Sequence, residues 1–176
     1  MNLEAFRAGF KGVRANRFKV TGAFPNAPGA QQGNAGLVNF EFYCKAASIP
    51  GSGIGIIPVG YKGRPVKFSG ERTYQDWIIQ VYDSSTPNIR KLFEDWVDYM
   101  DRRNAHEVNY NTVINNQWLI EYMDMSGSQS NSQYRRKFTL KNCWPVDVSA
   151  IEVSYDIPDT FAEFTVTLTY DFFEVV

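Results

Sequence analysis

Apolar and polar residues alternate with period two along most of this chain, and the alternation restricts the fold more than any other feature. It is clearest in 164–172, where one face is apolar and the other carries threonine and aspartate. The segments 37–44 and 117–124 show the same pattern, which places Phe40 and Phe42 on one face. Side chains of a strand point to opposite faces in turn, so each segment is predicted to be one half-buried strand.

Further strands rich in β-branched and aromatic residues complete a mainly β fold. About eight short strands favour two packed antiparallel sheets, as a sandwich or a barrel. A chain of 176 residues fits one domain, 1–176. The additional predicted strands are 17–22, 65–69, 74–83, 133–142 and 146–155.

One segment has helical spacing instead. The segment 85–103 is predicted to form a flanking helix, with the helix itself at about 87–103. Apolar residues recur there every three or four positions. Thr86 is expected to cap it, with Pro87 at the first helical position. Its apolar stripe needs cover, either from its own sheet or from a neighbouring chain. The candidate contact residues are Ile89, Leu92, Phe93, Trp96, Val97 and Met100.

The N-terminal segment 1–16 is predicted to contain a short amphipathic helix. Leu3, Phe6, Phe10 and Val13 are spaced three or four residues apart. The apolar face is small, so we expect a docking segment and no membrane anchor. No apolar run reaches the roughly 20 residues of a membrane-spanning helix.

Three segments are predicted to be loops. The stretch 23–36 is rich in Gly, Pro and Asn, 49–64 is rich in Gly, and 125–133 is rich in Ser. Loops longer than about 12 residues are uncommon in compact domains and are usually functional or mobile. An assembly can order such loops at its subunit contacts.

The composition leaves little material for catalysis. His106 is the only histidine, and Cys44 and Cys143 are the only cysteines, so we expect no catalytic, cofactor-binding or metal-binding residues and no enzyme activity. The glycines at 51–55 lead into Pro58 and open no helix, unlike a phosphate-binding loop. We expect both thiols to be reduced; the alternative is one disulfide, which requires Cα atoms within about 7 Å.

The charges are balanced. Lys plus Arg total 18 and Asp plus Glu total 19, for a net charge of −1. A protein that grips nucleic acid by its phosphates needs a cationic excess. Arg135, Arg136 and Lys137 form a short basic cluster, which is either a solvated strand face or a surface for nucleic acid or an acidic partner.

Five segments in collinear order carry a recognisable pattern. They are FYCKAASIP at 42–50 with IPVGY at 57–61, GERTYQDW at 70–77, Phe93 with Trp96, KNCWPVDV at 141–148, and TFAEFTVTLTYDFFE at 160–174. Together they resemble the tail tube proteins of contractile-tailed, T4-like bacteriophages. The pattern departs from that family at 23–36 and at 105–116.

The resemblance implies a structural subunit. Six copies would form a ring, with the inner sheet continuing between neighbours as a barrel, and rings would stack into a hollow tube. The implied partners are other copies of the chain, the tail sheath protein, the baseplate tube initiator, the tail terminator, the tape-measure protein and double-stranded DNA in transit. The implied location is the virion tail, assembled in the cytoplasm of the host bacterium, with no cofactor.

Two sets of assembly residues are expected. The candidates for contacts between rings are Leu3, Phe6, Phe10, Gly51, Gly53, Ile54, Gly55 and Ile56. A barrel this large keeps an aqueous channel, so its lumen face should be polar. The lumen candidates are Arg135, Lys137, Thr139 and Lys141, or Glu152 and Ser154, or Thr165, Thr167 and Thr169.

Three alternatives stay open. The chain could be the tube subunit of a related machine, such as an R-type bacteriocin, a type VI secretion system or an extracellular contraction system. It could be a β-sandwich module that binds carbohydrate or protein, with Trp77 or Trp144 stacking on sugars. A hydrolase would have to use His106.

Overall fold

The protein is described by a computed structural model that covers residues 3–10, 14–22, 24, 40–85, 88–100, 118–123, 134–156 and 159–175. The predicted loop at 125–133, the loop at 23–36 apart from Phe24, and His106 lie outside these residues.

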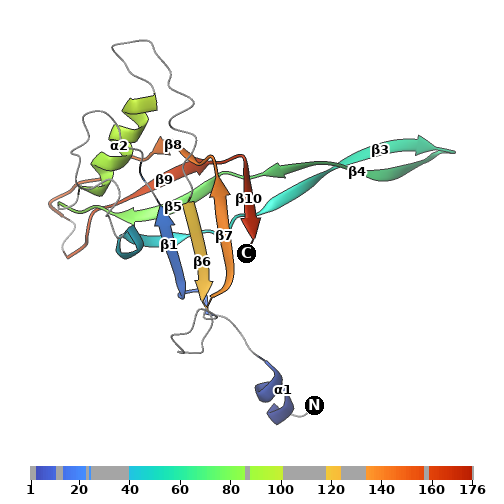
Figure 1. The fold of residues 1–176 in the computed structure, drawn as a ribbon, viewed down its shortest axis with the longest axis horizontal. Coiled ribbons are helices and arrows are strands. Elements are labelled where there is room, and N and C mark those ends of the chain that lie inside the picture. The colour runs from blue at the N-terminus through green and yellow to red at the C-terminus, as the bar shows by residue number, and fades with distance from the viewer. Residues whose placement is uncertain are drawn as a thin grey trace.

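Two four-stranded antiparallel sheets form the body of the molecule (Figure 1). Sheet I has the order β1 (Phe18–Gly22), β6 (Trp118–Met123), β7 (Tyr134–Lys141) and β10 (Phe172–Val175). Sheet II has the order β2 (Cys44–Ala47), β5 (Trp77–Tyr82), β9 (Glu163–Thr169) and β8 (Trp144–Val148). The predicted mainly β fold with packed antiparallel sheets is confirmed.

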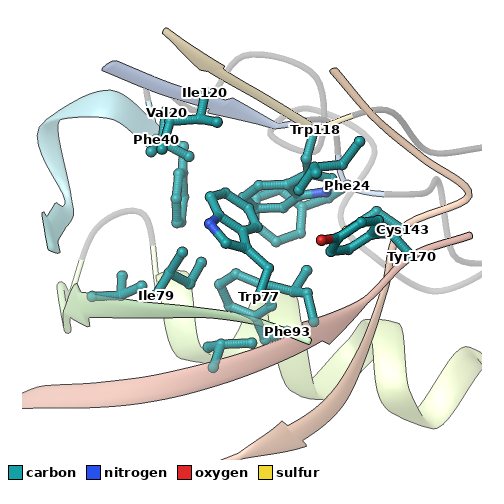
Figure 2. Close-up of a cluster of buried hydrophobic side chains, with 14 of the residues drawn as sticks. Val20, Phe24, Phe40, Trp77, Ile79, Phe93, Trp118, Ile120, Cys143 and Tyr170 are labelled. Atoms are coloured by element: carbon teal, nitrogen blue, oxygen red, sulfur yellow. The ribbon is translucent and has the colours of Figure 1, made fainter. Parts of the chain in front are cut away.

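The core lies between the two sheets (Figure 2). Trp118, Ile120 and Leu140 enter it from sheet I, and all are at most 1% exposed. Trp77 and Val166 enter it from sheet II and are buried to the same degree. The alternation in 164–168 therefore sorts the faces as predicted, because β9 buries one face and leaves the other outside. In β6, Trp118 and Ile120 are buried as predicted, but Glu121 on the other face is buried as well.

The predicted flanking helix is α2 (Ile89–Met100), which packs against β8 (Figure 1). Its cap differs from the prediction. The side-chain oxygen of Asn88 accepts a hydrogen bond from the backbone N–H of Lys91 at 2.8 Å, as an N-cap residue does. The helix therefore begins at Ile89, and Thr86 and Pro87, which were expected to cap it and to hold its first helical position, lie outside the described residues.

The glycine-rich segment 49–64 is not a loop. It contains β3 (Ser52–Tyr61), which pairs with β4 (Arg64–Tyr74) in a long two-stranded hairpin that projects from the body (Figure 1). Lys62 and Gly63 connect the strands with φ of 47° and 80°. Positive φ at both central residues is the type I′ turn, which matches the twist of a hairpin. The isoleucines and valines between the glycines supply the strand propensity.

The predicted strand at 37–44 was also wrong over its described part. Phe40–Phe42 form a 3₁₀ turn, and β2 begins only at Cys44. A 3₁₀ turn has three residues per turn, so side chains two positions apart diverge. Phe40 accordingly is 1% exposed, whereas Phe42 is 73% exposed.

The C-terminal alternation does not form one strand. β9 ends at Thr169, and the chain crosses to sheet I, where β10 begins at Phe172. Asn142 holds the crossing, because its side-chain N–H donates to the Asp171 carboxylate at 2.6 Å. Tyr170 stays buried, but Phe172 is 40% exposed and does not share the apolar face of β9.

The remaining strand predictions differ at their ends. The 65–69 strand is longer than expected, and the 74–83 segment is divided between β4 and β5. The strand expected at 146–155 lies at Trp144–Val148, and 149–154 has no strand structure. The strands expected at 17–22 and 133–142 are confirmed as β1 and β7 to within one residue.

We expect Gly22→Ala to destabilise the fold. A Cβ at Gly22 would lie 2.5 Å from ring carbons of Trp118, which is fully buried and cannot move aside. Overpacking of this kind costs about 1–3 kcal/mol. Gly60→Ala is the matched control, since a Cβ there meets no heavy atom within 4 Å. Urea unfolding measures both variants, and equal midpoints would contradict the packing described.

Candidate assembly surfaces

The predicted lumen residues are divided between opposite sides of the sandwich. Thr165, Thr167 and Thr169 lie on the outer face of sheet II, since the residues that alternate with them are buried. Lys137 and Thr139 lie on the outer face of sheet I, together with Lys141. One lumen therefore cannot be lined by both sets. Glu152 and Ser154 are exposed beside β9, and the Arg135 side chain lies outside the described residues.

Ion pairs cover the outer face of sheet I. Lys137 Nζ lies 2.8 Å from Glu121 Oε1, and the Glu121 side chain is only 7% exposed. Lys141 pairs with Glu174 at 3.3 Å, and Lys19 pairs with Glu41. Lys137 of the predicted basic cluster and the neighbouring Lys141 thus each meet a carboxylate of their own chain.

The outer face of sheet II is mostly uncharged. The threonine row of β9 is flanked by Ile78 and Gln80 of β5. Lys45 pairs with Glu163 at one end of this face, and Asp147 lies on β8. Hydroxyl, amide and aliphatic groups therefore form most of this surface.

The β3–β4 hairpin exposes an apolar face. In its outer part, Ile57 is opposite Phe68, Val59 is opposite Val66, and Tyr61 is opposite Arg64. Directly opposed residues of an antiparallel pair share a face. The apolar hairpin face, defined as Ile57, Val59, Tyr61, Val66 and Phe68, has side chains that are each 44–63% exposed.

The predicted inter-ring residues lie nearer the hairpin base. Ile54 and Ile56 are 57% and 63% exposed and belong to the other face of β3. Gly55 lies between them, Gly53 comes directly before Ile54, and Gly51 precedes the strand. A Cβ at Gly70 would approach the Gly55 backbone to 3.1 Å, so the two strands need glycine at this bulge. The sequence analysis omitted the apolar hairpin face, although period-two alternation on both sides of Lys62-Gly63 marked it.

The base of the hairpin is fixed to the sandwich. Trp77 Nε1 donates a hydrogen bond to the Ser48 carbonyl at 2.6 Å. This bond joins the two segments of the chain that connect β2 and β5 of sheet II to the hairpin. The Tyr74 ring packs edge-on against Phe173 of sheet I, with a centroid distance of 5.4 Å. The hairpin is therefore a continuation of the β2–β5 pair and is held from both sheets.

The N-terminal helix is confirmed as α1 (Leu3–Gly9), and Figure 1 shows it apart from the sheets. Leu3, Phe6 and Phe10 are 62%, 60% and 65% exposed, and the two phenyl rings stack at 5.2 Å. Val13 lies outside the described residues.

The apolar stripe of α2 is covered by its own chain. Ile89, Phe93 and Trp96 are at most 1% exposed and belong to the core. Leu92 and Met100 pack against that core, while Val97 is half-buried. The buried residues of α2 are therefore covered by the helix's own domain, and no neighbouring chain is needed to cover them.

A groove of about 820 Å³ lies beside β9, between its outer face and the chain that follows β8. Val153 and Phe161 stand at its sides, 87% and 84% exposed. Glu152, Asp159 and Glu163 line it, together with Lys45. The sequence analysis did not identify this groove, because it takes residues from four separate segments.

The described residues show little reactive chemistry. Among them, no three His, Cys, Asp or Glu residues are grouped to hold a metal ion, and no helix is long and apolar enough to cross a membrane. Cys44 and Cys143 are both free thiols. Burial raises the pKa of Cys44 to about 12 and raises the pKa of Cys143 as well.

Comparison with known proteins supports the resemblance. A family model described as "Phage tail tube protein" matches residues 13–176. Tail tube protein gp19 of Enterobacteria phage T4 is 26% identical over 136 residues, which cover 77% of this chain and 82% of that protein. The tail tube protein of Serratia phage KSP90 is 23% identical over 159 residues, covering 89% and 85% of the two chains.

Solved structures share the fold. A chain of the sheath/tube terminator of an extracellular contractile injection system, PVC, matches with a TM-score of 0.65 and 12% identity, covering 96% of this chain and 99% of that chain. A chain of the six-fold symmetrised baseplate of the anti-feeding prophage matches with a TM-score of 0.65 and 14% identity, covering 95% and 97%.

Both thiols should be unreactive in the folded protein at pH 8. Only the thiolate is nucleophilic, and a raised pKa leaves almost none of it at that pH. Labelling with iodoacetamide should be slow, and denaturation in urea should expose both thiols to rapid labelling. Since the unfolded thiols ionise near pH 8.5, the folded state should also lose stability as the pH rises above that value. Fast labelling of either cysteine before unfolding would contradict the burial described.

Proposed function

The chain belongs to the phage tail tube protein family, and from this we propose that it is the repeating subunit of a contractile tail tube. In this proposal six copies close a ring, and rings stack into a hollow tube that conducts DNA and the tape-measure protein. The protein acts structurally and has no catalytic role.

The apolar hairpin face is the observation that carries this proposal. It projects away from the core, so within the described structure its side chains are left in water. Contiguous exposed apolar surface of this kind marks a protein contact site. A second copy in the next ring would cover it, and the fixed hairpin base would hold it in position. Ile54 and Ile56, on the opposite face nearer the base, would make a separate contact with a neighbouring copy, together with Gly51, Gly53 and Gly55.

The strand edges support ring closure. β1 and β10 end sheet I, and β2 and β8 end sheet II. Exposed edges invite pairing with another chain, and a closed barrel removes them. A head-to-tail contact forms a closed ring when the rotation that relates neighbouring subunits returns to the first subunit. We propose six copies in this ring.

We place the outer face of sheet II toward the lumen. Its hydroxyl-rich surface would contact passing phosphates weakly, whereas a row of cations would hold them. The hairpin is also continuous with this sheet, so the sheet can extend from ring to ring. Sheet I, with its paired lysines and glutamates, would then face outward. Of the predicted lumen sets, this selects Thr165, Thr167 and Thr169 over Lys137, Thr139 and Lys141.

The remaining partners follow from the tube. The solved structures that share the fold come from assemblies named for a sheath, a tube terminator, a baseplate and a cap. We propose that this chain contacts a tail sheath protein outside and a tube initiator and terminator at the ends. Its place would be the virion tail, after assembly in the bacterial host. A tube in a related injection machine is the second candidate, and neighbouring genes for capsid and terminase would decide for the phage.

Purified protein should polymerise into hollow rods with six-fold end views, as seen by negative-stain electron microscopy. Phe68→Glu should prevent rods, because it places a charge on the apolar hairpin face, yet should leave the folded subunit intact, since the site is exposed. Lys67→Glu, exposed beside Phe68 on the opposite face of the same strand and paired with Pro58, is the matched control and should still form rods. Rods from Phe68→Glu, or stable monomers of the unmodified protein at high concentration with initiator present, would refute the proposal.

Lumen position can be tested by thiol access in assembled rods. Thr167→Cys should react with a small maleimide but not with a maleimide carried on a large protein, because the lumen excludes the carrier. Thr139→Cys, on the outer face of sheet I, should react with both. The reverse pattern would assign sheet I to the lumen.

A further inference from the structure

α1 is too short to be stable alone. Isolated helices of fewer than about 12 residues are marginal in water, and stability then comes from packing of an apolar face. α1 has 7 residues and presents Leu3 and Phe6 on one side, with Phe10 directly after its end. All three are exposed, and Figure 1 shows α1 well separated from the sheets, so its apolar side calls for a partner.

The groove beside β9 offers a matching surface. Phe161 packs edge-on against Tyr82 at 6.3 Å and keeps most of its ring exposed. Val153, Ala150 and Ala162 add further apolar lining. Aliphatic and aromatic side chains can therefore enter between polar edges, as in other helix-in-groove contacts.

The charges are complementary. The N-terminal segment carries Arg7, Lys11, Arg14 and Arg17 against a single Glu4. The groove carries Glu152, Asp159 and Glu163 against Lys45. Complementary potentials of this kind guide association and fix orientation.

We propose that α1 of one copy docks into the groove beside β9 of a second copy, with Leu3, Phe6 and Phe10 between Val153 and Phe161. The inference deepens the proposed self-assembly and rests on it, because it names the segment and its receptor. A second copy is the occupant since, in this structure, α1 lies beyond the ends of β6 and β7 (Figure 1) and contributes no residue to the groove lining of its own chain. Each subunit thus gives one helix and receives one.

Crosslinking of mixed single variants tests the contact. Ala5→Cys labels α1 without altering its apolar residues, and Ser154→Cys labels the groove without removing Val153. The two proteins are mixed, assembled and treated with a short bismaleimide, and covalent dimers are read on a denaturing gel. The native thiols do not compete, because both are shielded by burial. Val175→Cys, 55% exposed on β10, replaces Ser154→Cys in the control mixture.

The proposal expects a strong dimer band from Ala5→Cys with Ser154→Cys, at least tenfold above the Val175→Cys control. Rods without that band would overturn the docking site while leaving the proposed tube intact. A crosslink within single chains of the double variant, but not between mixed singles, would make the occupant the chain's own helix and overturn the second-copy assignment. Failure to form rods in any mixture, including unmodified protein, would instead refute the tube and the docking together.

Discussion

The packing around Trp118 is the constraint on which the rest of the structure depends. Its ring lies within 6.2 Å of five other aromatic rings, each from a different stretch of chain or from α2 (Figure 2). Phe40 comes from the 3₁₀ turn, Trp77 from sheet II, and Phe93 and Trp96 from the helix. Edge-to-face contacts at these distances fix ring orientation as well as burial. Both sheets and the helix therefore share one aromatic centre.

The sequence predicted those parts of the fold in which one periodicity runs over a whole element. β9 and α2 are examples, since their buried residues follow the period of a strand and of a helix. It failed where a local turn changes the geometry without changing the pattern. Phe40 and Phe42 alternate correctly yet sit in a 3₁₀ turn, and the alternation of β9 continues through Tyr170 and Phe172 although the chain changes sheets there. The glycines of 49–64 led to the prediction of a loop where the structure has a strand. The hairpin uses glycine for the close approach of its strands and for its turn.

The candidate surfaces show a further limit of sequence reasoning. Which polar faces lie together depends on strand pairing over long sequence distances, and no local signal reports that β7 joins β1 and β6 while β9 joins β5 and β8. Three segments of the family resemblance fall on junctions of this framework. FYCKAASIP and GERTYQDW cover the two sides of the hairpin base, and KNCWPVDV covers the corner at Asn142. The others belong to the core, since TFAEFTVTLTYDFFE contains β9, and Phe93 and Trp96 are buried in α2.

The position of the last two strands has a consequence for synthesis of the protein on the ribosome. β9 lies between β5 and β8 inside sheet II, and β10 closes one edge of sheet I, so neither sheet is complete until residues 163–175 have been made. The β3–β4 hairpin, with its exposed apolar hairpin face, is translated much earlier. Chains released early would lack both the finished sandwich and the wall of the groove formed by β9, and so could not be incorporated as sound subunits. Because the strands that complete both sheets come late in the chain, truncated subunits are excluded from the polymer.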